Sequence, residues 1–429
     1  VAVVGLRVIM MMLLVVLTLA VGYGLVTGYD CDQCQPEQVH ISFGEKSNEI
    51  VITWTTVEDT NASVVTFGIG QLRDQVIGTR TKFVDGGSER RAQYIHRTTL
   101  PGLQYDTTYV YNVGSDYGVS ELFSFHMPPE GTQWPVRAAI YGDMGMRNAH
   151  SLPFLQMEAE EGHFDVVLHV GDFAYDMHDD NARVGDQFMR QIQPIAAMVP
   201  YMTCPGNHEA AYNFSNYRSR FSMPGGTESM FYSFDLGPVH FVSISTEWYY
   251  EADDAESMLP KQYNWLENDL AMASHEENRT SRPWIVLMGH RPMYCSNSEI
   301  VDSYECIQER TRTGHPVHGH GLEPLLKKYG VDIVIWAHEH SYERLWPIYN
   351  YTVYNGSLEE PYTNPGAPVH IVTGSAGCEE DLDPYDNTQP DWSAFRTAVY
   401  GYTRFVAHNH THVYMEQAIR FYLVNLSHG

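Results

Sequence analysis

The first third of the chain alternates hydrophobic and polar positions over short segments. Between residues 36 and 128 these segments are QVHISF, EIVITWTT, SVVTFGI, YIHRTTL, TYVYNVG and LFSFHM, separated by clusters of Gly, Asn, Asp and Ser. A two-residue period over such lengths is typical of half-buried β-strands. The spacing predicts a small sandwich of the immunoglobulin or fibronectin type over residues 30–128. The Pro-containing stretch 128–135 is expected to be a linker.

From residue 134 onward, continuous hydrophobic runs replace the alternating ones. They are VRAAIY (136–141), DVVLHV (165–170), VPYMTC (199–204), WIVLM (284–288) and VDIVIW (331–336). Helices are expected between them at 149–161, 186–198, 262–274 and 322–329, the third starting after Pro260. Strands that alternate with helices predict an α/β domain over residues 134–429.

The segment 403–419 alternates like a pair of strands and would extend this domain at its C-terminal end. Its histidines, His408, His410 and His412, would then share one strand face. Three histidines at this spacing suit a metal, but an exposed strand face is the preferred interpretation.

The first 28 residues have the pattern of a signal peptide. A hydrophobic block at 8–21 follows a single basic residue, Arg7, and precedes small residues. The alternative is an uncleaved membrane anchor, but the block is shorter than the ~20 residues that usually span a bilayer. We therefore expect a secreted protein, or one of the lysosomal or endomembrane lumen, without a stable membrane span after cleavage.

Potential glycosylation sites and cysteines agree with this compartment. Asn-X-Ser/Thr sequons occur at Asn61, Asn213, Asn278, Asn350, Asn355, Asn409 and Asn425, which predicts a glycoprotein. Cys295 and Cys306 flank a polar loop and could pair locally. Cys31 and Cys34 form a lone CxxC, which is weak evidence for zinc without a second pair.

The charge of the chain argues against nucleic-acid duplexes as partners and constrains how a phosphate could be bound. Acidic residues outnumber basic ones 53 to 26, for a formal charge of −27. A protein without a basic surface is not expected to bind nucleic-acid duplexes. A phosphate-binding site in such a protein would need a local source of positive charge.

Each of the five hydrophobic runs ends in residues that can bind a metal. These are Asp143, Asp172 with Tyr175, Asn207 with His208, His290, and His338 with His340. In open α/β sheets, binding sites lie outside the carboxyl ends of the strands, so one topology would gather all five segments at one edge. Oxygen and imidazole donors suit iron, manganese or zinc. The set is too large for one ion, and a central Asp172 could bridge two, as in two-metal sites for displacement at phosphorus.

These segments, GDMG, GDFAY, GNHE, the strand-end His290 and AHEH, occur in the order of the purple acid phosphatase pattern, and the chain resembles that family over nearly all of its length after the signal. The resemblance implies a central αββα metallophosphoesterase sandwich. It also implies an acid phosphatase that hydrolyses phosphate monoesters by in-line attack of an Fe(III)-bound hydroxide. By the same resemblance, Fe(III) is held by Asp143, Asp172, Tyr175 and His340. A divalent iron, zinc or manganese is held by Asp172, Asn207, His290 and His338, with the catalytic His208 near the phosphate.

The chain departs from the family pattern in three places. Ala337 stands where the family has glycine, and Leu287 stands at the family's valine position. The residues after His290 are RPMYCSNS, without the histidines that many members carry near the leaving group. His315, His318 and His320 occur only in the next loop. The proton donor to the leaving group is therefore left open.

Two other functions compete with this one. A zinc or manganese metallophosphodiesterase, or a nucleotide hydrolase, would share the fold and most of the segments, but the simpler members lack a phenolate ligand such as Tyr175. A non-enzymatic adhesion glycoprotein would not need the complete set of ligands. The physiological substrate and the oligomeric state stay open.

Overall fold

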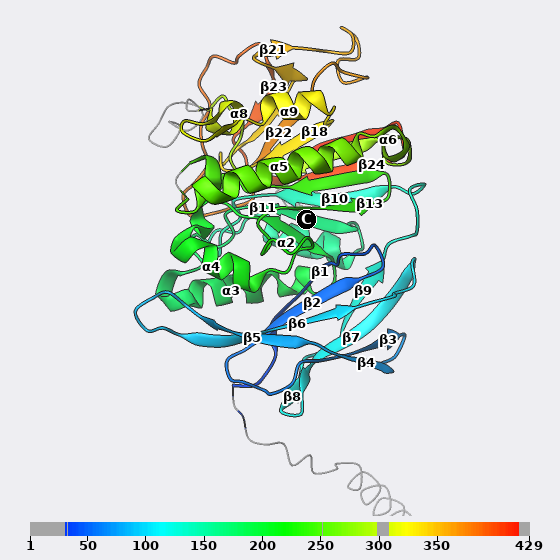
Figure 1. Ribbon diagram of the computed structural model, residues 1–429, viewed down its shortest axis with the longest axis vertical. Coiled ribbons are helices and arrows are strands. Elements are labelled where there is room, and N and C mark those ends of the chain that lie inside the picture. The colour runs from blue at the N-terminus through cyan, green and yellow to red at the C-terminus, as the bar shows by residue number, and fades with distance from the viewer. Residues whose placement is uncertain (1–30, 32, 251, 298–308, 420–429) are drawn as a thin grey trace, which may run out of the picture.

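The computed structural model describes residues 31, 33–250, 252–297 and 309–419, so the expected signal peptide (1–28) lies outside the described residues. Strands β1 to β9 form a two-sheet sandwich at the N-terminal end (Figure 1). One sheet has the order β1 (Glu37–Phe43), β2 (Ile50–Thr56), β6 (Ala92–Leu100), β5 (Thr79–Val84). The other has β4 (Asp74–Ile77), β3 (Val64–Ile69), β7 (Thr107–Ser115) and β8 (Gly118–Val119), with β9 (Phe123–Met127) paired to β7. Trp54, Tyr111 and Phe125 are buried in the hydrophobic core. The predicted β-sandwich is confirmed.

Three strands of this sandwich, β4, β5 and the two-residue β8, were missed by the hydrophobic pattern. β4 and β5 are mostly exposed. Their sequences, DQVI and TRTKFV, therefore lack the regular alternation of a half-buried strand, and their register comes from pairing with β3 and β6.

A second pair of sheets follows. The five-stranded sheet has the order β12 (Tyr201–Cys204), β11 (Val166–Val170), β10 (Val136–Tyr141), β24 (Gly401–Ala407), β25 (Val413–Ile419). The seven-stranded sheet has the order β13 (Tyr232–Leu236), β14 (Val239–Ser243), β15 (Trp284–Met288), β18 (Ile333–Trp336), β22 (Val369–Thr373), β19 (Tyr342–Leu345), β23 (Ser393–Thr397). The Gly142 N–H donates to the Thr373 carbonyl at 3.0 Å, so the sheets meet beside the carboxyl end of β10. Because β10–β11–β12 and β14–β15–β18–β22 are parallel, their carboxyl ends share one edge.

Helices cover the outer faces of these two sheets, which confirms the αββα architecture (Figure 1). The helices are α2 (Leu152–Glu160), α3 (Asp179–Ala196), α4 (Ala211–Arg220), α5 (Ala255–Ala273), α6 (Glu276–Ser281), α8 (Arg310–Thr313) and α9 (Glu323–Lys328). The start predicted for α5 was wrong, because Pro260 lies inside the helix. It is the sixth helical residue, so the helix continues through it without the hydrogen bond that an N–H there would make to the Glu256 carbonyl. None of the helices in the described ranges is long and hydrophobic enough to cross a bilayer.

The C-terminal segment pairs as predicted but places its histidines differently. β24 and β25 form an antiparallel hairpin, and residues 408–412 make its turn. His408, His410 and His412 therefore do not share a strand face. His410 Nε2 lies 2.9 Å from the Thr132 carbonyl, so this turn contacts the segment that joins the sandwich to β10.

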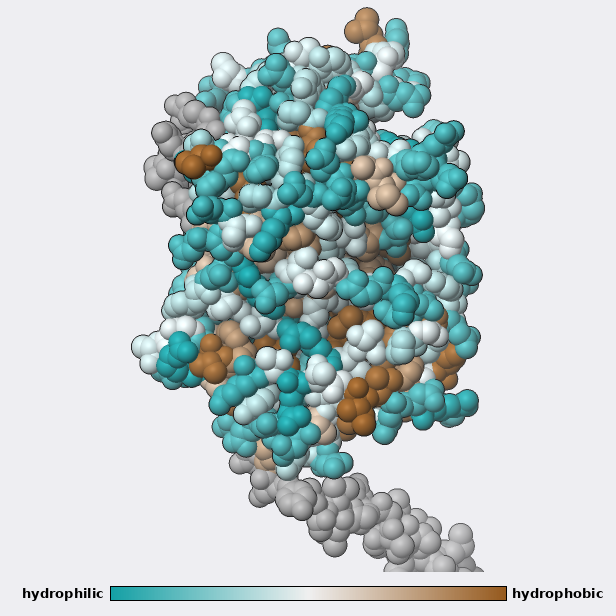
Figure 2. Space-filling view, viewed as in Figure 1, coloured by the Kyte–Doolittle hydropathy of each residue, from teal (hydrophilic) through white to brown (hydrophobic). Residues whose placement is uncertain are grey.

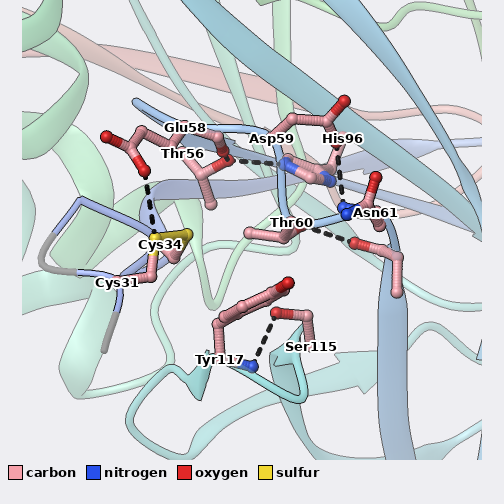
Figure 3. The surroundings of a disulfide bond; sticks show 11 residues. Cys31, Cys34, Thr56, Glu58, Asp59, Thr60, Asn61, His96, Ser115 and Tyr117 are labelled. Atoms are coloured by element: carbon pink, nitrogen blue, oxygen red, sulfur yellow. Dashed lines mark hydrogen bonds between the residues drawn. A yellow bond between two sulfur atoms is a disulfide. The ribbon is translucent and has the colours of Figure 1, made fainter. Parts of the chain in front are cut away.

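Cys31 and Cys34 form a disulfide (Figure 3). Their sulfurs are therefore not available as the thiolate ligands of a zinc site. The Glu58 carboxylate lies 3.3 Å from Cys31 Sγ, and nearby Thr56 bonds to His96. Cys306 lies outside the described residues, so its pairing with Cys295 stays a prediction.

The visible surface in Figure 2 is mainly hydrophilic, in keeping with the charge of −27. Hydrophobic residues gather chiefly over the N-terminal β-sandwich on this face.

Candidate metal centre

The predicted ligands are brought together where strands of both sheets end. Asp143 follows β10, Asp172 follows β11, and His338 follows β18. These three residues have φ of 57°, 52° and 70°, in the left-handed region that non-glycine residues rarely adopt. Such turns cost free energy and cluster at functional sites. Each of the three residues lies two positions past the end of its strand and therefore stays at the edge of the sheet.

Three of the predicted ligands form one group. The Tyr175 hydroxyl donates to Asp143 Oδ1 at 3.1 Å and lies 2.8 Å from His340 Nε2. His340 Nε2 lies 3.6 Å from the same Asp143 oxygen. The Asp381 carbonyl lies 3.0 Å from His340 Nδ1, so Nδ1–H donates to it and Nε2 faces Tyr175 and Asp143.

A second group surrounds Asp172. His290 Nε2 lies 3.0 Å from Asp172 Oδ2, 3.1 Å from Asn207 Oδ1 and 3.2 Å from His338 Nδ1. His290 Nδ1 donates to the Val170 carbonyl at 2.8 Å, which leaves Nε2 for the centre of the group. Asp172, His290 and His338 each offer a donor atom within 4.8 Å of the others.

The loop that carries Asp172 is held by a residue that the sequence did not single out. Glu209 is almost fully buried, and its carboxylate accepts N–H groups from Asp172 at 2.9 Å, Phe173 at 3.1 Å and Gly206 at 2.9 Å. It thus joins the Asp172 turn to the loop that carries Asn207. The acid that ends GNHE was the only available signal.

His208 lies beside these groups. Its Nδ1 lies 2.7 Å from Asp176 Oδ1, and its ring centroid is 4.3 Å from that of Tyr175. Glu380 approaches the other side, with Oε1 3.7 Å from His208 Nε2. Burial acts to lower the pKa of His208, but Asp172 and Asp176 outweigh it and raise the pKa to about 10. Asp176 was also not predicted.

Two close approaches explain small residues at the site. A Cβ on Gly206 would lie 2.1 Å from Asp172 Oδ1, so only glycine lets this backbone pass. A Cβ on Gly142 would lie 2.4 Å from the methyl group of Ala337. The alanine at the family's glycine position is therefore accommodated by Gly142.

Protonation and cation binding are coupled at this centre. Burial raises the pKa of the Asp143 carboxyl to about 7. Burial acts to lower the pKa of His290, but Asp172 outweighs it and raises the pKa to about 9. Burial acts to raise the pKa of Asp172, but His290 and His208 outweigh it and hold the pKa below its usual range. A cation needs these donors deprotonated, so its binding would displace protons.

The donor set fits two cations. Carboxylate, phenol, amide oxygen and imidazole are ligands for iron and zinc, and both oriented histidines are held by backbone carbonyls, as metal-bound imidazoles usually are. The loop histidines fall elsewhere. His315 stacks on His318 at 4.5 Å and His320 packs on Tyr263 at 4.8 Å, in the short hairpin of β16 (Gly314–His315) and β17 (Gly319–His320).

Known proteins match this chain along most of its length. Three family models match it: calcineurin-like phosphoesterase over residues 136–342, iron/zinc purple acid phosphatase-like protein C over 367–419, and purple acid phosphatase, N-terminal domain, over 36–127. Acid phosphatase type 7 from Mus musculus is 54% identical over 387 residues, which cover 89% of this chain and 87% of that protein. The Homo sapiens protein of the same name is 52% identical, covering 89% and 87%.

A solved structure agrees. The purple acid phosphatase from yellow lupin (Lupinus luteus) seeds superposes with a TM-score of 0.74 at 26% identity, covering 90% of this chain and 72% of that one. With these matches beside the gathered strand-end ligands, the chain belongs to the purple acid phosphatase family.

Proposed function

We propose that this protein is an acid phosphatase that hydrolyses phosphate monoesters at a centre of two metal ions. The observation that supports this function is the approach of two ligand groups to each other, since the Asp143 N–H donates to the Gly171 carbonyl at 3.2 Å and the His338 N–H donates to Asp143 Oδ2 at 2.9 Å. Asp143, Tyr175 and His340 form one group, and Asn207, His290 and His338 form the other around Asp172 itself. Asp172 directly follows Gly171, and its carboxylate is the group that would be suited to bridge two ions held by these donors.

We assign Fe(III) to Asp143, Asp172, Tyr175 and His340, and a divalent iron, zinc or manganese to Asp172, Asn207, His290 and His338. A phenol oxygen is a hard anionic donor and favours the ferric ion. When bound, the pair of cations supplies Lewis acidity and the local positive charge that attracts a phosphate ester to an acidic protein.

The protein's own side chains orient the ligand loops and supply a proton donor. Asp176 holds the His208 ring beside the Tyr175 ring, and the raised pKa of His208 keeps it protonated under acid conditions. Protonated His208 is suited to donate from Nε2 to a phosphate oxygen or to the departing oxygen. Glu209 keeps the Asp172 and Asn207 loops in register.

The experiment that tests this function combines metal analysis with two assays. The purified protein is expected to hold two metal ions, one of them iron, and to hydrolyse an aryl phosphate monoester in preference to the matched diester, with an acid optimum. Asp172→Asn should lose metal and activity together. A protein with full activity after this change, or one that prefers the diester near pH 9, would contradict the proposal.

Glycosylation and a lumenal or secreted location are proposed as well. The sequon asparagines within the described residues are all exposed: Asn61, Asn213, Asn278, Asn350, Asn355 and Asn409. The Cys31–Cys34 disulfide is typical of an oxidising compartment. Digestion with an N-glycosidase should reduce the mass of protein expressed in animal cells. Asn278→Gln should lower the mass by that of one glycan. A mass that does not change on digestion would contradict the proposed glycosylation.

A further inference from the structure

The helices that follow two of the ligand loops begin with unusual backbone. Tyr175 lies just before α3, and Asn207 and His208 lie just before α4. The first turn of each helix contains three consecutive residues with φ between 49° and 66°, at 180–182 in α3 and 212–214 in α4. Non-glycine residues keep such a conformation only where surrounding contacts enforce it. The contacts around these turns therefore bear on the ligand loops in front of them.

At the first turn of α3 these contacts come from the N-terminal β-sandwich. The Glu89 N–H, in the loop between β5 and β6, donates to Asn181 Oδ1 at 3.0 Å. The Glu89 carboxylate pairs with Arg183 at 2.6 Å. Ala182 is buried against Phe83 and Ile95 of the sandwich.

The same loop of the sandwich holds the first turn of α4. The Gly86 backbone packs on the Tyr212 ring, where a Cβ at position 86 would lie only 2.3 Å from the ring. Asp85 accepts from Asn216 Nδ2 at 3.1 Å, one turn farther along the helix. Loop 85–91 thus contacts both helices directly after their ligand loops.

A buried ion cluster ties the three parts together. Asp186 of α3 pairs with Arg220 of α4 at 2.8 Å and with Arg91 of the sandwich at 2.5 Å. The Asp186 and Arg220 side chains are each 1% exposed. Arg220 also donates to the sandwich residue Gln38 at 3.0 Å and to the Ala182 carbonyl at 3.2 Å. Figure 1 shows α3 and α4 lying between the sandwich and the catalytic sheets.

We propose that the N-terminal β-sandwich is a positioning unit for the metal centre. Through loop 85–91 it holds the first turns of α3 and α4, and thereby sets the spacing between the Tyr175 loop and the Asn207–His208 loop. Arg91 is a positioning residue in this role, because it acts through Asp186 and not on the substrate. This inference rests on the proposed function, since it requires both metal sites.

The test compares two arginines of the sandwich in the full-length protein. Arg91→Met removes the pair with Asp186, and Arg80→Met removes a pair with Asp59 of the same 2.5 Å length that lies within the sandwich. We expect Arg91→Met to lose metal to a chelator on the order of tenfold faster than wild type, in the range known for residues that support metal ligands. Its visible absorption maximum should also shift. Arg80→Met should match wild type in its rate of metal loss and in its absorption maximum. Arg91→Lys should restore most of the metal retention that Arg91→Met loses.

The outcomes distinguish a failure of the positioning role of the sandwich from a failure of the proposed function. Equal metal-loss rates and spectra for Arg91→Met, Arg80→Met and wild type would overturn the inference, whatever happens to the melting temperature. If Arg91→Met does not fold, Gly86→Ala carries the test. Its methyl group displaces Tyr212 without removing a charge, and a wild-type rate of metal loss in that variant would overturn the inference. Wild-type protein that holds fewer than two ions contradicts the proposed function instead.

Discussion

The Glu209 carboxylate accepts the backbone N–H of Asp172 at 2.9 Å, so the proposed bridging residue is held by its neighbouring loop. The same carboxylate oxygen also accepts from Gly206 at 2.9 Å, and the other accepts from Phe173 at 3.1 Å. One side chain therefore satisfies three buried donors, and removing it would leave them unpaired.

Glu209→Ala is expected to lower the free energy of unfolding by about 3 kcal/mol, because unpaired buried donors each cost ~1–3 kcal/mol and the effects are not additive. Glu209→Gln can keep one carbonyl oxygen on Asp172 and Gly206, so it should lose less. Urea unfolding and metal content measure the series. Glu228→Gln, at an exposed carboxylate, is the control. Equal stability of wild type and Glu209→Ala would show that the three bonds contribute nothing net.

Tyr175→Phe should abolish the phenolate-to-iron charge-transfer colour while leaving the fold almost unchanged. The change removes only the oxygen that contacts Asp143 and His340, and the ring can keep its place beside His208. Visible absorption and circular dichroism of the iron-loaded protein check this. Tyr212→Phe, at a half-exposed ring, should stay coloured. A coloured Tyr175→Phe protein would remove Tyr175 from the ligand set.

Gly142 and Ala337 should be energetically coupled. A Cβ on Gly142 would lie 2.4 Å from the Ala337 methyl group and 2.9 Å from the Val170 carbonyl. Overpacking of this kind costs ~1–3 kcal/mol, so Gly142→Ala should destabilise the protein and disturb the adjacent Asp143. Adding Ala337→Gly should recover part of the loss, with a coupling of ~0.5 kcal/mol or more by thermal unfolding. Strict additivity would mean that the two residues do not meet.

His240 should stabilise the protein at low pH and not at high pH. Its ring lies between Asp235 at 2.7 Å and Asp269 at 3.0 Å. Burial acts to lower the pKa of His240, but these two bonds outweigh it and raise the pKa to about 9. A raised histidine pKa contributes stability that is fully present below the unfolded value of about 6.5 and is lost as the pH rises through about 9.

His240→Asn should therefore lower the free energy of unfolding by about 2 to 3 kcal/mol near pH 6, and by much less near pH 10. Urea unfolding at the two pH values measures the difference. His126→Asn breaks an exposed pair with Asp106 and should have little effect at either pH. A loss for His240→Asn that grows with pH would contradict the assignment.

The meeting of the proposed ligand residues was predictable because two simple regularities coincide at them. Each follows a hydrophobic run that can only be a buried strand, and parallel strands bring their carboxyl ends to one edge. Asp143 and His338, far apart in sequence, thus meet through the His338 N–H and Asp143 Oδ2 at 2.9 Å. The donor residues and their order along the chain could be predicted without knowing the conformations of the loops.

What the sequence did not predict depends on contacts without a local pattern. A glutamate is usually expected at the solvent-exposed surface, and only the tertiary structure turns the Glu209 carboxylate toward Asp172. Arg91 and Asp186 lie in different layers of the molecule, and no period or motif links them. The early start of α5 was missed because proline is a common signal for the first turn of a helix, whereas Pro260 is the sixth residue of this one.

Strand β10, which ends just before Asp143, is paired on one side by β11 and on the other by β24, with Val136 opposite Ala407. During synthesis the second partner leaves the ribosome only after some 260 further residues have been made, counting from β10 at 136–141 to β24 at 401–407. Until then one edge of β10 stays open to pairing with other chains. The strand that leads to the metal centre is therefore among the last parts of the nascent protein to gain both partners, and a chain that ends before residue 401 lacks one of the two strands that pair with β10.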